Sequence, residues 1–125
     1  MASQQTINLN LAGATAVLPA NATAALINLT VDFDATMPSY LTVWPQGEPR
    51  PLASANNAEP GLISANSMLA KLGTTGGISI FNQQGAVNLV IDVVGYTIAL
   101  ADAGLDHGGH LLSGNGAPSN SLGDD

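Results

Sequence analysis

The sequence predicts an all-β protein: a β-sandwich with jelly-roll-like Greek-key connections and an extended C-terminal tail. Apolar and polar residues alternate in several short segments, which is the period of a β-strand. Clusters of Gly, Pro and Asn separate these segments, as turns separate the strands of sandwiches and barrels. No strand-then-helix alternation is present, and the β pattern ends near Ile98, where a Gly-rich, acidic segment begins.

The clearest alternation covers residues 25–34. Its apolar side chains fall on one face and its Asn, Thr and Asp side chains on the other, which predicts a strand with one wet side. The apolar set is Ile27, Leu29, Val31 and Phe33. Further strands are expected at 6–11, 15–18, 40–44, 62–72 and 77–82. Since Met, Leu, Ala and Lys favour helix, a helical turn at 67–72 is an alternative.

Residues 86–96 are apolar on both faces, which predicts a strand that is covered on both sides or central in its sheet. Its nearness to 77–82 predicts a hairpin between the two. The Pro-rich stretch 46–57 is expected to form a long connection of polyproline or turn character. Connections of this length are suited to Greek-key crossovers.

The chain has 125 residues and a formal net charge of −7, with Arg50 and Lys71 as its only strong cations. We expect one sandwich domain at 1–101 and a tail at 102–125, because the tail cannot bury enough apolar surface to offset its ordering entropy. A nucleic-acid backbone would be repelled, as would an anionic membrane surface. The absence of cysteine rules out a disulfide scaffold.

Insertion into a membrane is not expected. The longest apolar run, 87–100, is interrupted by polar residues and by Gly95, and it is shorter than the ~20 residues that span a bilayer. The first residues, MASQQTINLN, have neither the basic nor the apolar region of a secretory signal. Export, if it occurs, is therefore expected to use another route.

The body of the sequence contains LPANATAALINLTVDFD, YLTVWP, Arg50-Pro51 and DVVGY. It resembles an accessory β module of exported and cell-wall-associated actinobacterial proteins. That pattern opens on ANATAV, contains GYLTVYP and RP at its centre, and closes on DVVGYY. The resemblance covers residues 17–97 and implies no catalytic activity.

The end of the sequence reads HLLSGNGAPSNSLGDD. It resembles the LSG-x-G-x-P…LG segment of bacteriophage tail-fibre and minor tail proteins, which continues where this chain ends and so implies a longer parent. The resemblance implies a structural protein of an actinobacterial phage virion: a minor tail, fibre or decoration protein in assembly or host-surface contact. Its partners would be other virion proteins and further copies of itself, with a trimer expected.

A rival function follows from the body alone. A carbohydrate- or envelope-binding module of an actinobacterial surface protein would be secreted or displayed on the cell, and its ligand would be a cell-envelope glycan. Tyr40 and Trp44 would form its contact patch if they were exposed, although a position in the core or at its edge is the simpler interpretation. An exposed aromatic platform would favour this rival over the virion protein.

The tail holds the strongest candidate for metal binding. Asp106, His107 and His110 offer a carboxylate and two imidazoles, which are ligands for divalent transition metals. The alternative is a polar loop in which two histidines merely lie among glycines. Because a closed four-ligand spacing is lacking, we expect neither a metal nor a cofactor.

No catalytic motif supports an enzyme. Asp32 and Asp34 lie on one strand face, whereas the paired carboxylates of glycosidases flank a cleft. A solvated face is therefore expected.

Asp92 lies in a strand that is apolar on both faces, and a buried carboxylate must be paired. We predict that it forms an ion pair with Arg50, which would pin the Pro-rich connection to the sheet. The alternative is an edge position with Asp92 in water.

Overall fold

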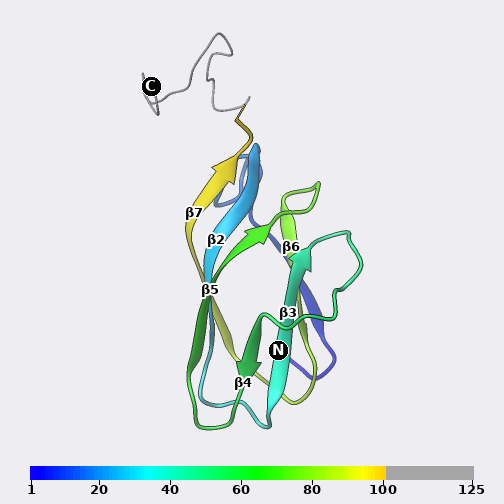
Figure 1. Cartoon of the computed structure of the whole chain (residues 1–125), viewed down its shortest axis with the longest axis vertical. Helices are drawn as coiled ribbons and strands as arrows, with labels where there is room; N and C mark the ends of the chain where they lie inside the picture. The colour runs from blue at the N-terminus through cyan, green and yellow to red at the C-terminus, as the bar shows by residue number, and fades with distance from the viewer. Residues whose placement is uncertain (101–125) are drawn as a thin grey trace.

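The computed structural model describes residues 1–100 and shows two antiparallel sheets that face one another (Figure 1). The predicted all-β class is confirmed, and residues 1–100 contain no helix. The strands are β1 (Thr6–Asn10), β2 (Ala22–Val31), β3 (Ser39–Pro45), β4 (Asn56–Ala58), β5 (Ser64–Lys71), β6 (Gly77–Asn82) and β7 (Leu89–Ile98). One sheet has the order β1-β6-β3-β4 and the other β5-β2-β7.

Strand β2 forms the centre of the three-stranded sheet. Its alternation works as predicted, because Ile27, Leu29 and Val31 are fully buried between the sheets. The strand ends at Val31. Phe33 lies beyond that end and is 56% exposed, so its predicted place on the buried face is wrong. Two residues past the last ladder position, the backbone no longer directs the side chain inward.

Strands β3 and β6 form the middle of the other sheet. Strand β6 has the predicted bounds and every one of its residues is buried, because one face meets the core and the other is covered. In β3, Leu41 and Val43 point toward the core. Pro45 is the last residue of β3 and pairs with Ile78, which agrees with its inability to continue a central ladder.

Two of the weaker strand predictions have different outcomes. Residues 64–71 form strand β5, which pairs with β2 along its whole length and buries Ala70. The helical alternative is therefore wrong, because pairing and burial outweigh a modest helix propensity. Residues 15–18 form no strand, and only an isolated bridge joins Ala12 to Leu18. The short strand β4 had no sequence signal.

Strand β7 differs most from its prediction. It pairs only with β2 and is an edge strand, and it lies in a different sheet from β6, so the expected hairpin is wrong. Leu89, Ile91 and Val93 pack on the core, while Val90 and Val94 are more than half exposed. Within residues 1–100, no layer therefore covers the apolar residues on its second face.

The Pro-rich connection also has a different role from the one expected. Strands β3 and β4 are neighbours, so residues 46–55 join adjacent strands and do not cross between the sheets. Within the described chain, each of the other connections passes from one sheet to the other. This crossover pattern interleaves distant segments and holds the two sheets together.

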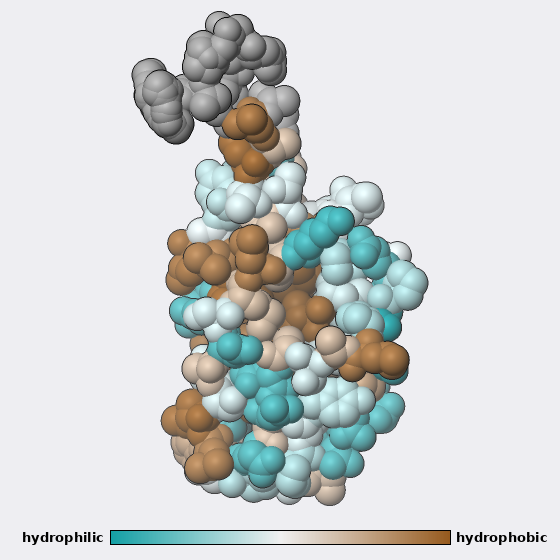
Figure 2. All heavy atoms as spheres, in the orientation of Figure 1, coloured by the Kyte–Doolittle hydropathy of each residue, from teal (hydrophilic) through white to brown (hydrophobic). Residues whose placement is uncertain are grey.

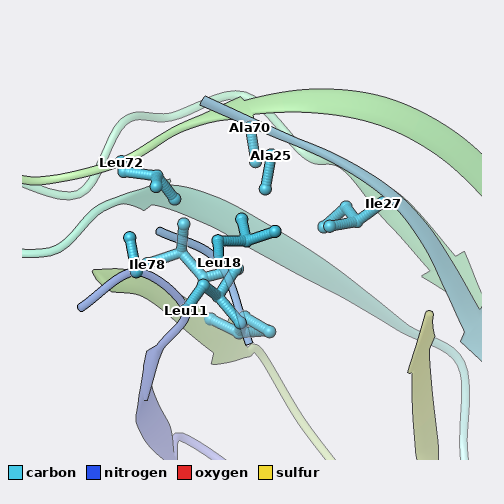
Figure 3. Packing of buried hydrophobic residues seen from close by; sticks show 9 residues of the cluster. Leu11, Leu18, Ala25, Ile27, Ala70, Leu72 and Ile78 are labelled. Carbon is cyan, nitrogen blue, oxygen red and sulfur yellow. The ribbon is translucent and has the colours of Figure 1, made fainter. Parts of the chain in front are cut away.

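The core lies between the sheets in two clusters of buried residues. Figure 3 shows the larger cluster, in which Ala25, Ile27 and Ala70 face Leu11 and Ile78 from the opposite side. The smaller cluster contains Leu29, Val31, Ala35, Leu41, Ala58 and Val87. Partly buried hydrophobic residues pack against both clusters: Met1, Val43, Met68, Leu89 and Ile91.

A buried asparagine joins the two sheets of the sandwich. Asn56 of β4 donates from Nδ2 to the carbonyls of Leu29 (3.0 Å) and Ser64 (3.2 Å), which lie in the other sheet. Its Oδ1 accepts a hydrogen bond from the Ser64 hydroxyl at 2.7 Å. Because both sheets contribute to this network, it fixes how one sheet sits on the other.

Candidate functional site

The outward face of the four-stranded sheet carries a cluster of aromatic side chains. Tyr40 and Trp44 alternate with inward residues along β3, and Phe81 lies on β6 opposite Thr42. The chain has five aromatic residues, and three of them share this face. Trp44 and Phe81 are 9% and 4% exposed, whereas Tyr40 is 39% exposed.

The 46–55 connection covers part of this aromatic face. The guanidinium carbon of Arg50 lies 3.7 Å from the centroid of the Phe81 ring, within the range of a cation–π interaction. At the end of the connection, the Ala55 amide donates to the Leu41 carbonyl at 2.6 Å. Between these two anchors, Leu52 is fully exposed.

The predicted contact patch of Tyr40 and Trp44 is therefore only half accessible. The two side chains share one face, but Trp44 is buried and Tyr40 alone presents an aromatic surface to solvent. Their spacing along a strand placed them on one face. The contact of Arg50, in the connection after β3, with Phe81 on β6 left no signal in the sequence.

The predicted ion pair between Arg50 and Asp92 is wrong. Arg50 lies over Phe81 on the outward face of the four-stranded sheet. Asp92 is exposed on β7, opposite Asn28, on the outward face of the other sheet. The alternative of an edge position in water is the one observed. Since β7 has no covering layer, Asp92 does not need the compensation that burial would have required.

The two carboxylates after β2 accept hydrogen bonds, one from the next residue and one from a residue far along the chain. The Oδ1 of Asp32 accepts the Phe33 amide at 2.7 Å, and the Oδ2 of Asp34 accepts the Asn88 amide group at 2.5 Å. Both residues had been expected on one face of the strand. They instead follow its end at Val31. The first bond lies within the turn after β2 and the second joins this segment to the residue before β7, and the two converge on no cleft.

The metal-binding candidates Asp106, His107 and His110 lie outside the described residues, as does the predicted tail. Within residues 1–100 there is no group of three or more His, Cys, Asp or Glu side chains that could hold a metal ion. An open groove of about 510 Å³ is lined by Met1, Gln5, Ile7, Asn88 and Leu89. Amide and aliphatic side chains of this kind provide no general acid or base.

The outward face of β5, β2 and β7 is apolar at its centre, and no other element of residues 1–100 covers it. Leu26 and Leu69 pair across the two strands, and Val90 and Val94 lie on β7. Leu69 is 60% exposed and Val94 58% exposed. Figure 2 shows hydrophobic surface on the side of the molecule where Figure 1 places these strands. Monomeric proteins seldom leave contiguous apolar side chains in water without a use for them.

A second apolar surface lies where the connections β2–β3 and β4–β5 meet. The Gly61 amide donates to the Phe33 carbonyl at 2.7 Å, and Phe33, Leu62 and Ile63 are each more than half exposed. Sequence reasoning missed this surface. Loop residues have no periodicity, so only the folded chain shows that these side chains are neighbours.

Comparison with models of protein families, with curated proteins and with solved structures found no match. Residues 1–100 contain no helix that is long and apolar enough to cross a membrane.

Proposed function

We propose that this chain is a non-enzymatic structural protein of an actinobacterial bacteriophage virion, acting in assembly or host-surface contact as a minor tail, fibre or decoration protein. The observation that carries the proposal is the uncovered apolar face of β5, β2 and β7, with Leu69 and Val94 more than half exposed. Surfaces of this kind are buried when copies or partners assemble. Other virion proteins and further copies of the chain are its expected partners.

Two further features support a structural role. Charged residues are only 9% of the chain, and the acidic side chains near the end of β2 accept hydrogen bonds from Phe33 and Asn88. The sheets also end in unpaired edges, including the ten-residue strand β7, and such edges accept another strand readily. The resemblance of the tail to segments of phage tail proteins supports the proposal that these surfaces act in a phage particle.

The proposal is tested by quantitative mass spectrometry of phage particles purified on two successive density gradients. The expected result is a fixed copy number relative to the major capsid protein, unchanged between the gradients. A major host cytoplasmic protein serves as the control and should fall with each step. A chain that is depleted along with that control is not a virion component.

Binding of a cell-envelope glycan is a second candidate function, since Tyr40 is 39% exposed beside the aromatic residues Trp44 and Phe81. The test is retention of the protein on actinobacterial cell walls. If Tyr40 stacks on a sugar, Tyr40→Ala should abolish retention, whereas Tyr96→Ala should not, because Tyr96 belongs to the other sheet. Equal retention of both variants and the parent chain would contradict glycan stacking at this face.

A further inference from the structure

The outward face of β5, β2 and β7 carries two opposite charges in addition to its apolar centre. Lys71 on β5 and Asp92 on β7 are both exposed, and within residues 1–100 neither has an ionic partner. Lys71 is the only lysine of the chain. Arg50, the other strong cation, is engaged by Phe81 on the opposite side of the sandwich. The one cation without a described partner therefore lies on the one broad face without a cover.

The two charges lie on opposite sides of Leu26. Leu26 pairs with Leu69, and Lys71 is two residues beyond Leu69 toward one end of the sheet. Asp92 pairs with Asn28, two residues from Leu26 toward the other end. Strands are about 4.8 Å apart and residues rise about 3.4 Å along a strand. Lys71 and Asp92 thus have similar offsets from Leu26 in opposite directions.

This arrangement is self-complementary. A two-fold axis can lie in the plane of the face, pass through Leu26 and run perpendicular to the line from Lys71 to Asp92. Such an axis places the Lys71 of each copy against the partner's Asp92 and brings the two Leu26 side chains together. Contacts between identical subunits about a two-fold axis require this property of a surface.

The backbone leaves room for the contact. Gly95 lies across from Leu26 on β7, and a Cβ atom built there would be 3.8 Å from the Leu26 Cβ. A side chain at that position would shield Leu26, but glycine leaves it open. Val94 is the extra residue where the register between β2 and β7 shifts, and it stands exposed beside Leu26.

From these observations we propose that a second copy of this chain docks on the outward face of β5, β2 and β7, with two Lys71–Asp92 ion pairs flanking a Leu26, Leu69 and Val94 centre. The inference rests on the proposed self-association of the chain and names the surface that would carry it. Sheets pack on one another with strands either nearly aligned or nearly orthogonal, and the axis described gives a steep crossing. A closed trimer uses heterologous contacts and so would use other surfaces.

Charge reversal tests the proposal on the full chain by size exclusion with light scattering and by sedimentation equilibrium. The parent chain should have the molar mass of a dimer. Lys71→Glu and Asp92→Lys should each weaken the dimer about tenfold or more, because each places like charges opposite one another. Glu59→Lys is the matched control, since it changes the net charge as Asp92→Lys does but lies in the β4–β5 connection.

Two combinations are specific to the two-fold geometry. The double variant Lys71→Glu with Asp92→Lys keeps the net charge of −7 and should dimerise again. An equimolar mixture of the two single variants should form a heterodimer, because each copy then supplies two like charges that match those of the other. A nonspecific effect of charge would not restore dimerisation in both the double variant and the mixture.

The apolar centre has its own matched pair of variants. Leu69→Ser should weaken the dimer, whereas Leu52→Ser should not, although Leu52 is the more exposed of the two. If the parent chain oligomerises and the charge reversals leave its molar mass unchanged, the proposed docking surface is wrong, but the proposed self-association stands. A trimer would do the same. A parent chain that is monomeric up to high micromolar concentration would overturn the proposed self-association itself.

Discussion

Among single residues, buried polar side chains contribute most to the specificity of this fold. Asn82 is fully buried, and its Nδ2 donates to the carbonyls of Ala2 (3.0 Å) and Gly85 (2.7 Å). Its Oδ1 accepts a hydrogen bond from the Ser39 hydroxyl at 2.6 Å. One side chain thus joins β6 to β3, to the start of the chain and to the turn after β6.

We expect Asn82→Ala to lower the free energy of unfolding by about 2–4 kcal/mol, because it removes three hydrogen bonds made from a fully buried position. Urea unfolding measures the change. Asn57→Ala is the matched control, since Asn57 is exposed on neighbouring β4 and such substitutions stay within about 0.5 kcal/mol. Equal midpoints for the two variants would show that the Asn82 network adds no stability.

Among the elements, the 46–55 connection shows how a loop can complete a sheet. It starts next to Trp44, places Arg50 on Phe81 and returns to Leu41. The outward face of β3 and β6 is thereby buried without a third layer of secondary structure. The face of β5, β2 and β7 has no such connection, and its apolar residues stay in contact with solvent.

We expect Arg50→Ala to loosen this cover. Loss of the cation–π contact should cost about 0.5–2 kcal/mol of stability, and acrylamide should quench the fluorescence of Trp44, the only tryptophan, more strongly. Arg50→Lys should retain part of the effect, since an ammonium also attracts a ring. Glu48→Ala, on the same connection, is the control. Unchanged quenching in Arg50→Ala would mean that Arg50 does not hold the cover in place.

At the scale of the whole molecule, the topology joins segments that are far apart in the chain. Strand β1 pairs with β6 and β2 pairs with β7, and only β3 and β4 are consecutive strands that pair. Folding must therefore close long loops before most strand pairs form. Proteins dominated by such non-local pairing fold slowly.

We expect refolding on the millisecond-to-second scale, at about 1–1000 s⁻¹, as for other all-β sandwiches. Stopped-flow fluorescence of Trp44 after dilution from urea measures the rate. Dilute protein is needed, because two-fold association would otherwise add a concentration-dependent phase. Relaxation within microseconds would indicate that local contacts, and not the crossovers, determine the rate.

The sequence predicted the positions of the strands better than it predicted which strands pair. Alternation located β2, and turn residues on either side located β6 with its observed bounds, because both signals are local. The hairpin of β6 with β7 and the crossover at 46–57 were wrong, since which strands pair depends on how the whole chain closes. Of the candidate sites, only the half-exposed pair Tyr40 and Trp44 was located on one face in advance.

Sequence alone determined the class of this protein, the strands with strong alternation and the lack of positive charge, because each follows from local pattern or composition. Only the tertiary structure decided which apolar face is covered. Val90 and Val94 looked like core residues in the sequence, yet they lie on an open face, while Trp44 is buried on the outward face of the other sheet. A hydrophobic residue of the core and one on an open face look the same in a sequence, since burial depends on the position of every other element of the fold.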